Sequence, residues 1–120
     1  MKTYLLIFSL LFCATTSNAE DTWDSQEKGL AATMSTLLIV DWGQTINIAR
    51  DPTYCEVNPL LGSHPEEKDV HLYMGSALIG TLAISHLLPS KYRSLFMFSI
   101  IAIELPTVYN NHKIGLRMPF

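Results

Sequence analysis

The chain has 120 residues and a formal net charge of −3; 48% of its residues are hydrophobic and 16% are charged. A chain of this size fits one domain, and its acidic balance leaves no basic stripe, so nucleic acid is excluded as a partner. The high apolar fraction and the positive mean hydropathy keep the membrane class open.

Residues 1–19 have the three parts of a secretory signal peptide. Met1-Lys2 is a basic start, an apolar stretch follows over 4–14, and a polar end closes in Ser17-Asn18-Ala19. The apolar stretch is too short for a comfortable bilayer span, so cleavage after Ala19 is predicted. We therefore expect Sec-type export, with location in the bacterial inner (plasma) membrane.

Three helices are predicted after this segment. A polar lead, 20–29, precedes a first helix over 30–50, which ends before Pro52 because the residue before a proline is disfavoured in helices. A second helix, about 70–88, contains no Asp, Glu, Lys or Arg. A third helix, about 93–109, is apolar over most of its length and is expected to kink near Pro106; a tail, 113–120, follows.

The loop between the first two helices contains several turn signals. Asn58-Pro59 suits a cap followed by proline at the first helical position, which predicts one turn ending at Gly62. Ser63 and Glu66 have capping-box spacing and predict the start of the second helix.

The fold class expected is all-α, a signal peptide followed by a three-transmembrane-helix bundle over 30–112. The second helix is apolar on all sides, and the third offers water no polar face. The first helix would insert poorly alone, because about seven apolar residues at roughly −0.5 kcal/mol each are nearly offset by about +3 kcal/mol for Asp41. The alternative is a soluble exported three-helix bundle that buries the same apolar runs.

Two helices carry polar side chains at helical spacing. Asp41, Gln44 and Thr45 lie on one face of the first helix, and Glu104, with Asn111 two turns later, lies on the third. If the faces meet, the two carboxyl groups would share a proton or recruit a cation, because two ionised groups repel in a low dielectric.

Candidate companions for these carboxyl groups are His86 and Arg93. The plain alternative is that the polar groups pair across helices and fix the packing only.

Catalytic and metal sites are not expected. The four histidines lack metal-ligand spacing, no Cys-x-x-Cys occurs, and no nucleophile elbow surrounds Ser76. After signal cleavage Cys55 is the remaining cysteine and has no partner for an internal disulfide, so it is expected to be an inert thiol. We therefore predict a non-enzymatic protein without cofactor or metal.

The order Asp41-x-x-x-Thr45, then Glu56-x-Asn58-Pro59, resembles a group of small uncharacterised bacterial and phage-associated membrane proteins with these two signatures. The similarity covers about 37–61. It implies a helical membrane fold and a shared polar site, and no substrate. The loop is expected to bring Glu56 back toward the first helix, either to the polar face or to an ion pair with Arg50.

The functional prediction is an interaction or accessory module in the membrane, with lipids and a helix partner or a second copy as partners. The first alternative is a proton, ion or small-ligand relay or transport module that uses Asp41 and Glu104. The second is an exported soluble helical binding protein.

Overall fold

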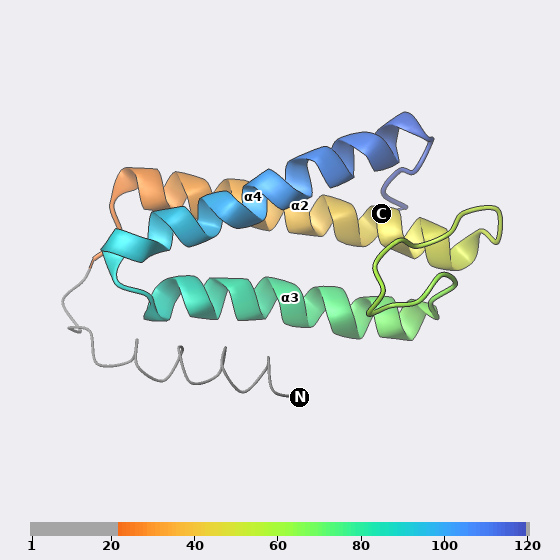
Figure 1. Ribbon diagram of the computed structural model, residues 1–120, viewed down its shortest axis with the longest axis horizontal. Helices are drawn as coiled ribbons and strands as arrows, with labels where there is room; N and C mark the ends of the chain where they lie inside the picture. The colour runs from red at the N-terminus through yellow and green to blue at the C-terminus, as the bar shows by residue number, and fades with distance from the viewer. Residues whose placement is uncertain (1–21, 120) are drawn as a thin grey trace.

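A computed structural model describes residues 22–119, and within them the protein consists of three helices without a strand (Figure 1). The helices are α2 (Ser25–Arg50), α3 (Glu67–Leu87) and α4 (Ser90–Lys113). The predicted all-α class and helical bundle are therefore confirmed. The predicted signal peptide, 1–19, lies outside the described residues.

The bundle is organised around α2. This helix packs along both α3 and α4, whereas α3 and α4 have few contacts with each other. The short connection at Leu88-Pro89 makes α3 and α4 antiparallel, and the loop 51–66 and the C-terminal tail 114–119 lie at the opposite end of the bundle (Figure 1). The central position of α2 therefore brings its polar face against that of α4.

The first helix begins earlier than predicted. The Glu27 amide donates to Asp24 Oδ1 at 2.7 Å, and the Asp24 amide donates to Glu27 Oε2 at 3.0 Å. This reciprocal capping box satisfies two helix-end donors and starts α2 at Ser25, inside the stretch assigned to a polar lead. The helix ends at Arg50, as Pro52 predicts.

The loop prediction is half right. Asn58 caps the predicted turn: the Leu60 amide donates to Asn58 Oδ1 at 3.0 Å, and Gly62 ends the turn with φ +77°, which glycine adopts without strain. The predicted capping box of Ser63 is wrong, because the N-cap of α3 is Glu66 and no side chain caps it.

Two small apolar clusters hold the helices together. Met34, Leu38 and Met97 form one cluster, and the other is formed by Ile46, Val70 and Met74. Methionine is common here because its unbranched chain fills irregular gaps between helices. α4 continues without interruption through Pro106.

The tail folds back onto α2, which the sequence did not predict. Leu116 is 1% exposed, and the Tyr54 hydroxyl donates to the Ile114 carbonyl at 3.3 Å. A Cβ atom on Gly43 would lie 2.9 Å from Met118 Cγ, so α2 needs a glycine at this crossing.

Candidate functional site

A polar seam lies between α2 and α4. It is formed by five residues, three from α2 and two from α4: Asp41, Gln44, Thr45, Glu104 and Asn111. The spacing of three and four residues places the α2 members on one face, as the sequence predicted. The structure brings all five together because that face packs against α4.

Hydrogen bonds tie the seam across the two helices. Asn111 Nδ2 donates to Asp41 Oδ1 at 3.1 Å, and Thr45 hydrogen bonds the same carboxyl group. Gln44 Nε2 donates to the Val108 carbonyl at 3.2 Å. These contacts join the side chains of α2 to α4.

The carboxyl groups of Asp41 and Glu104 are hydrogen bonded to each other. A carboxylate has acceptors and no donor, so this contact requires one proton on the pair. Two ionised carboxylates in contact would repel each other. The contact is therefore favourable when the pair holds one proton, which leaves it with one negative charge.

Two acceptors of the seam lack a donor. Gln44 is 2% exposed, and its Oε1 receives no hydrogen bond from the described residues; Glu104 Oε2 is likewise buried without one. Buried polar atoms are almost always partnered, so an unpartnered pair in one small region is unusual. This arrangement could accept a hydrogen-bond donor or a cation.

The loop residues of the resemblance are placed next to the seam and not in it. Glu56 accepts from the backbone amides of Val57 and Asn58, both at 2.9 Å, and reaches Asp41 only through its charge. Asn58 caps its own turn, and Pro59 is exposed. The expected ion pair of Glu56 with Arg50 is wrong, because the Arg50 Nε donates to Glu67 Oε2 at 3.0 Å.

The two predicted companions of the carboxyl groups lie elsewhere. His86 is exposed near the end of α3. Arg93 is 1% exposed but donates to both oxygens of Glu27, at 3.1 Å each, at the far end of the bundle. This Glu27 and Arg93 pair was missed because Glu27 was placed in an unstructured lead; the Asp-x-x-Glu spacing was the signal for its helix.

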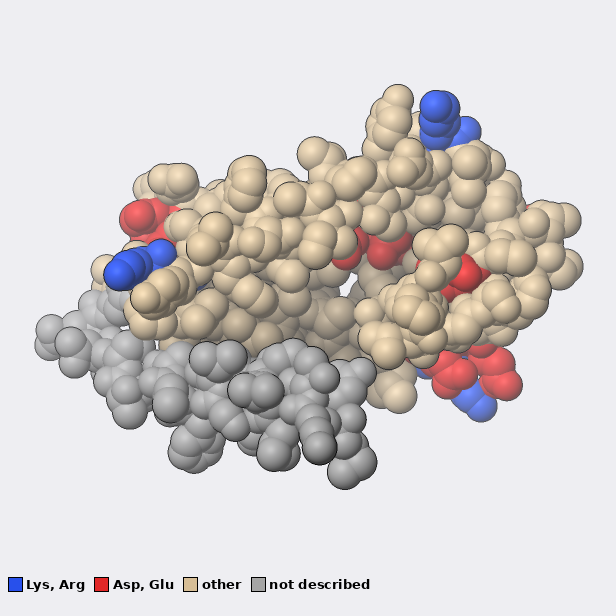
Figure 2. Space-filling model, viewed as in Figure 1, with Lys and Arg blue, Asp and Glu red and all other residues tan. Residues whose placement is uncertain are grey.

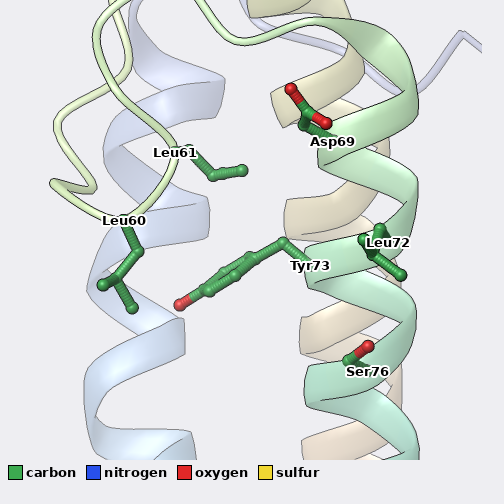
Figure 3. Close-up of a pocket in the computed structure, with 6 residues that line it drawn as sticks. All are labelled: Leu60, Leu61, Asp69, Leu72, Tyr73 and Ser76. Carbon is green, nitrogen blue, oxygen red and sulfur yellow. The ribbon is translucent and has the colours of Figure 1, made fainter. Parts of the chain in front are cut away.

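A separate groove of about 360 Å³ lies between the loop and α3 (Figure 3). The ring of Tyr73 extends from α3 across it, and its hydroxyl end lies beside Leu60 (Figure 3). Leu61 and Leu72 complete an apolar lining, to which Asp69 adds the one charge. The groove is thus chemically unlike the seam.

Within residues 22–119 no group of three or more His, Cys, Asp or Glu side chains is arranged to hold a metal ion. Cys55 is exposed, and its Sγ lies 3.9 Å from His64 Nε2. That contact joins two loop residues at the surface.

No family model, curated protein or solved structure matches the chain. Its function therefore has to be argued from its own fold and site.

Proposed function

We propose that the protein is a small integral membrane protein whose three helices form an interaction or accessory module, located in the bacterial inner membrane. The observation that carries the proposal is an exposed apolar belt around α3 and α4, with the basic residues confined to the ends of the helices. An aqueous bundle would turn these side chains inward.

The second helix is the strongest part of the belt. Of the described helices, α3 alone is long and apolar enough to cross a membrane by length and composition, with a mean hydropathy of 1.3 over its best window. The core helix of a soluble protein passes the same test but is mostly buried, whereas only 17% of this window is buried. Ile79 and Leu72 are 71% and 72% exposed.

The dimensions of α4 also suit a bilayer. Lys91 and Lys113 lie at its two ends, roughly 33 Å apart at the helical rise. The exposed Tyr92 and Tyr109 lie just inside them, about 26 Å apart, which matches aromatic anchors at the edges of a hydrocarbon core of ~30 Å. Between them Phe98 is 61% exposed.

The distribution of basic residues also supports insertion of the three helices in a membrane. The segments 29–49, 70–90 and 94–112 contain no Lys or Arg. Figure 2 shows basic side chains at the two ends of the visible face and a wide area without basic side chains between them. Acidic atoms in the middle of that face are set back between other side chains (Figure 2).

The first helix crosses with help from its neighbours. Asp41 and Gln44 would make α2 costly to insert alone, and α2 does not pass the length and hydropathy test. In the bundle these residues bond to α4 instead of facing lipid. The uncovered apolar faces of α3 and α4 then contact lipid and a helix partner, which includes a second copy of the chain.

Alkaline carbonate extraction of membranes from cells that express a C-terminally tagged copy tests the proposal. We expect the protein in the pellet, at the mass of 20–120. A protein released with the soluble fraction would overturn it and favour the exported soluble bundle. A cleaved signal would leave residue 20 on the outside, so one crossing by α2 would place the loop, with its exposed Cys55, in the cytosol. A membrane-impermeant maleimide should therefore label Cys55 only after the cells are opened, with a Cys55→Ser variant as the matched control.

A further inference from the structure

We infer that the polar seam is a binding site for one small monovalent cation, either a proton that the two carboxyl groups share or a Na⁺ that replaces it. The inference goes beyond the interaction module, since it concerns the interior of the bundle and not the lipid-facing surface. Two observations carry it: the contact between two carboxyl groups, and the buried oxygen of Gln44 that has no donor.

The charge of the seam is uncompensated by the described chain. No Lys, Arg or His side chain of residues 22–119 bonds to Asp41 or Glu104. Three titratable groups from the neighbouring elements are engaged elsewhere or are themselves acidic. Glu56 of the loop is an acid. His71 of α3 accepts a hydrogen bond from Trp42 and lies beside Glu67. Arg117 of the tail donates to the carbonyls of His112 and Leu116.

Gln44 offers a neutral oxygen ligand on the same face of α2, one helical turn after Asp41. Its Nε2 is committed to the carbonyl of Val108, one helical turn after Glu104, so the amide lies along the seam with Oε1 left over. Carboxylate and amide oxygens are the ligands of hard cations. A buried acceptor without a donor is uncommon in native structures.

The exchange balances in charge and atoms. With a proton bound, the pair is one carboxylic acid and one carboxylate that share it. When Na⁺ enters, that proton leaves to solvent, and two carboxylates with one Na⁺ remain, so the seam keeps one net negative charge. With two carboxylates and no third acidic ligand arranged around one point, the ligand set suits a monovalent ion better than a divalent one.

The test uses the full-length protein purified in detergent, in weakly buffered solution near neutral pH. NaCl is added against choline chloride at the same ionic strength. A pH-indicator dye measures proton release, and infrared difference spectra follow the protonated carboxyl C=O band. We expect Na⁺, and not choline, to release about one proton per chain and to remove the band. Absence of both responses would overturn the inference.

Three variants assign the response to the seam. Glu104→Gln replaces the shared proton with an amide N–H that still donates to Asp41, so it should fold and yet lose both responses. Gln44→Met should retain the protonated band and weaken Na⁺ binding on the order of tenfold, the effect of losing one buried polar contact. Glu67→Gln, at an exposed ion pair, should respond as the natural protein does.

Two results with these variants would count against the site. An undiminished response in Glu104→Gln would place the proton elsewhere, and an unchanged Na⁺ affinity in Gln44→Met would leave the amide without a role. If Glu104→Gln fails to give a helical circular dichroism spectrum, the natural protein and Gln44→Met decide. Carbonate extraction is scored separately, so failure of the membrane proposal is distinguishable from failure of the cation site.

Discussion

The bundle contains two polar clusters of opposite construction between its helices. At the end where α3 meets α4, Arg93 donates to both oxygens of Glu27 and to the carbonyls of Ser85 and Leu88, each at 2.8 Å, and its guanidinium lies 4.8 Å over the ring of Trp23. In the polar seam two acids meet without a basic side chain among the described residues. The first cluster matches every charge with its opposite, and the second does not.

The end cluster, formed by Glu27 and Arg93, compensates its buried charges. Burial acts to raise the pKa of Glu27, but hydrogen bonds from Ser90, the Asp24 amide and Arg93, together with the charge of Arg93, outweigh it and hold that pKa below its ordinary value. Arg93 also satisfies carbonyls that the C-terminus of α3 leaves open. The cluster therefore joins three helix ends at once.

The seam lacks such matching, and packing alone gives no reason for it. Two unpartnered acceptors and a pair of acids reduce stability relative to apolar residues of the same volume. A side chain kept at a cost to stability is a candidate for function. The comparison thus assigns the end cluster to folding and the seam to binding, and the following changes test that division.

Arg93→Met should have the largest effect. It leaves Glu27 buried without its cation and opens two helix-end carbonyls, and breaking a buried pair costs about 3–5 kcal/mol. We expect about 3 kcal/mol here, because the cluster lies at an end of the bundle. The measurement is thermal unfolding in detergent, followed by circular dichroism.

Lys91→Met is the matched control, since Lys91 is an exposed basic residue on the same turn of α4 whose contact is with the ring of Tyr92. Its unfolding should be unchanged. The double variant Arg93→Met with Glu27→Leu should recover part of the stability that Arg93→Met loses, because it removes the carboxylate left without its cation. A loss below about 1 kcal/mol for Arg93→Met would contradict the folding role of the end cluster.

Glu104→Met should have the opposite sign. It removes a buried acceptor that has no donor and leaves Asp41 with the hydrogen bonds of Asn111 and Thr45, so we expect the free energy of unfolding to rise by about 1 kcal/mol. The same unfolding assay measures it, with the level of protein in cells as a second readout. A clear destabilisation would mean that the seam is structural after all.

Asp41→Asn distinguishes a binding role of the seam from a packing role in cells. The binding role predicts a normal level of inserted protein with loss of the cation response, whereas a packing role predicts loss of the protein itself. Quantitative blotting of the membrane fraction separates the two.

The sequence predicted the features that depend on local spacing. Three helices and the two polar faces follow from periodicity and from breakers such as Pro52. The two polar faces are expected to contact each other, because polar side chains are costly to bury against apolar ones. The pair of Glu27 with Arg93 was missed because its members are 66 residues apart and one was assigned to a loop. Leu116 is buried because the C-terminal tail packs against α2, and no local sequence pattern predicts that contact.

Gly43→Ala tests that crossing, which lies next to the seam on α2. The new Cβ would lie 3.3 Å from Met118 Cα as well as 2.9 Å from its Cγ, so the backbone of the tail has to move. We expect a loss of about 1 kcal/mol, the lower range for overpacking, and faster proteolysis after Arg117. Gly29→Ala is the control, because nothing lies near its Cβ. Equal proteolysis in both variants would show that the tail does not need this glycine.

The smallest effect is expected at the exposed ion pair between Arg50 and Glu67, which lies outside both clusters. The hydrogen bond from Arg50 lowers the pKa of Glu67, so the folded pKa lies below the unfolded one. The contribution to stability is then present above the unfolded pKa and is lost as the pH falls through the folded pKa. Glu67→Gln should flatten the acid limb of the plot of Tm against pH and leave neutral stability almost unchanged, since exposed pairs contribute little. An acid limb equally steep in the variant would trace the pH dependence to a buried group such as Glu27.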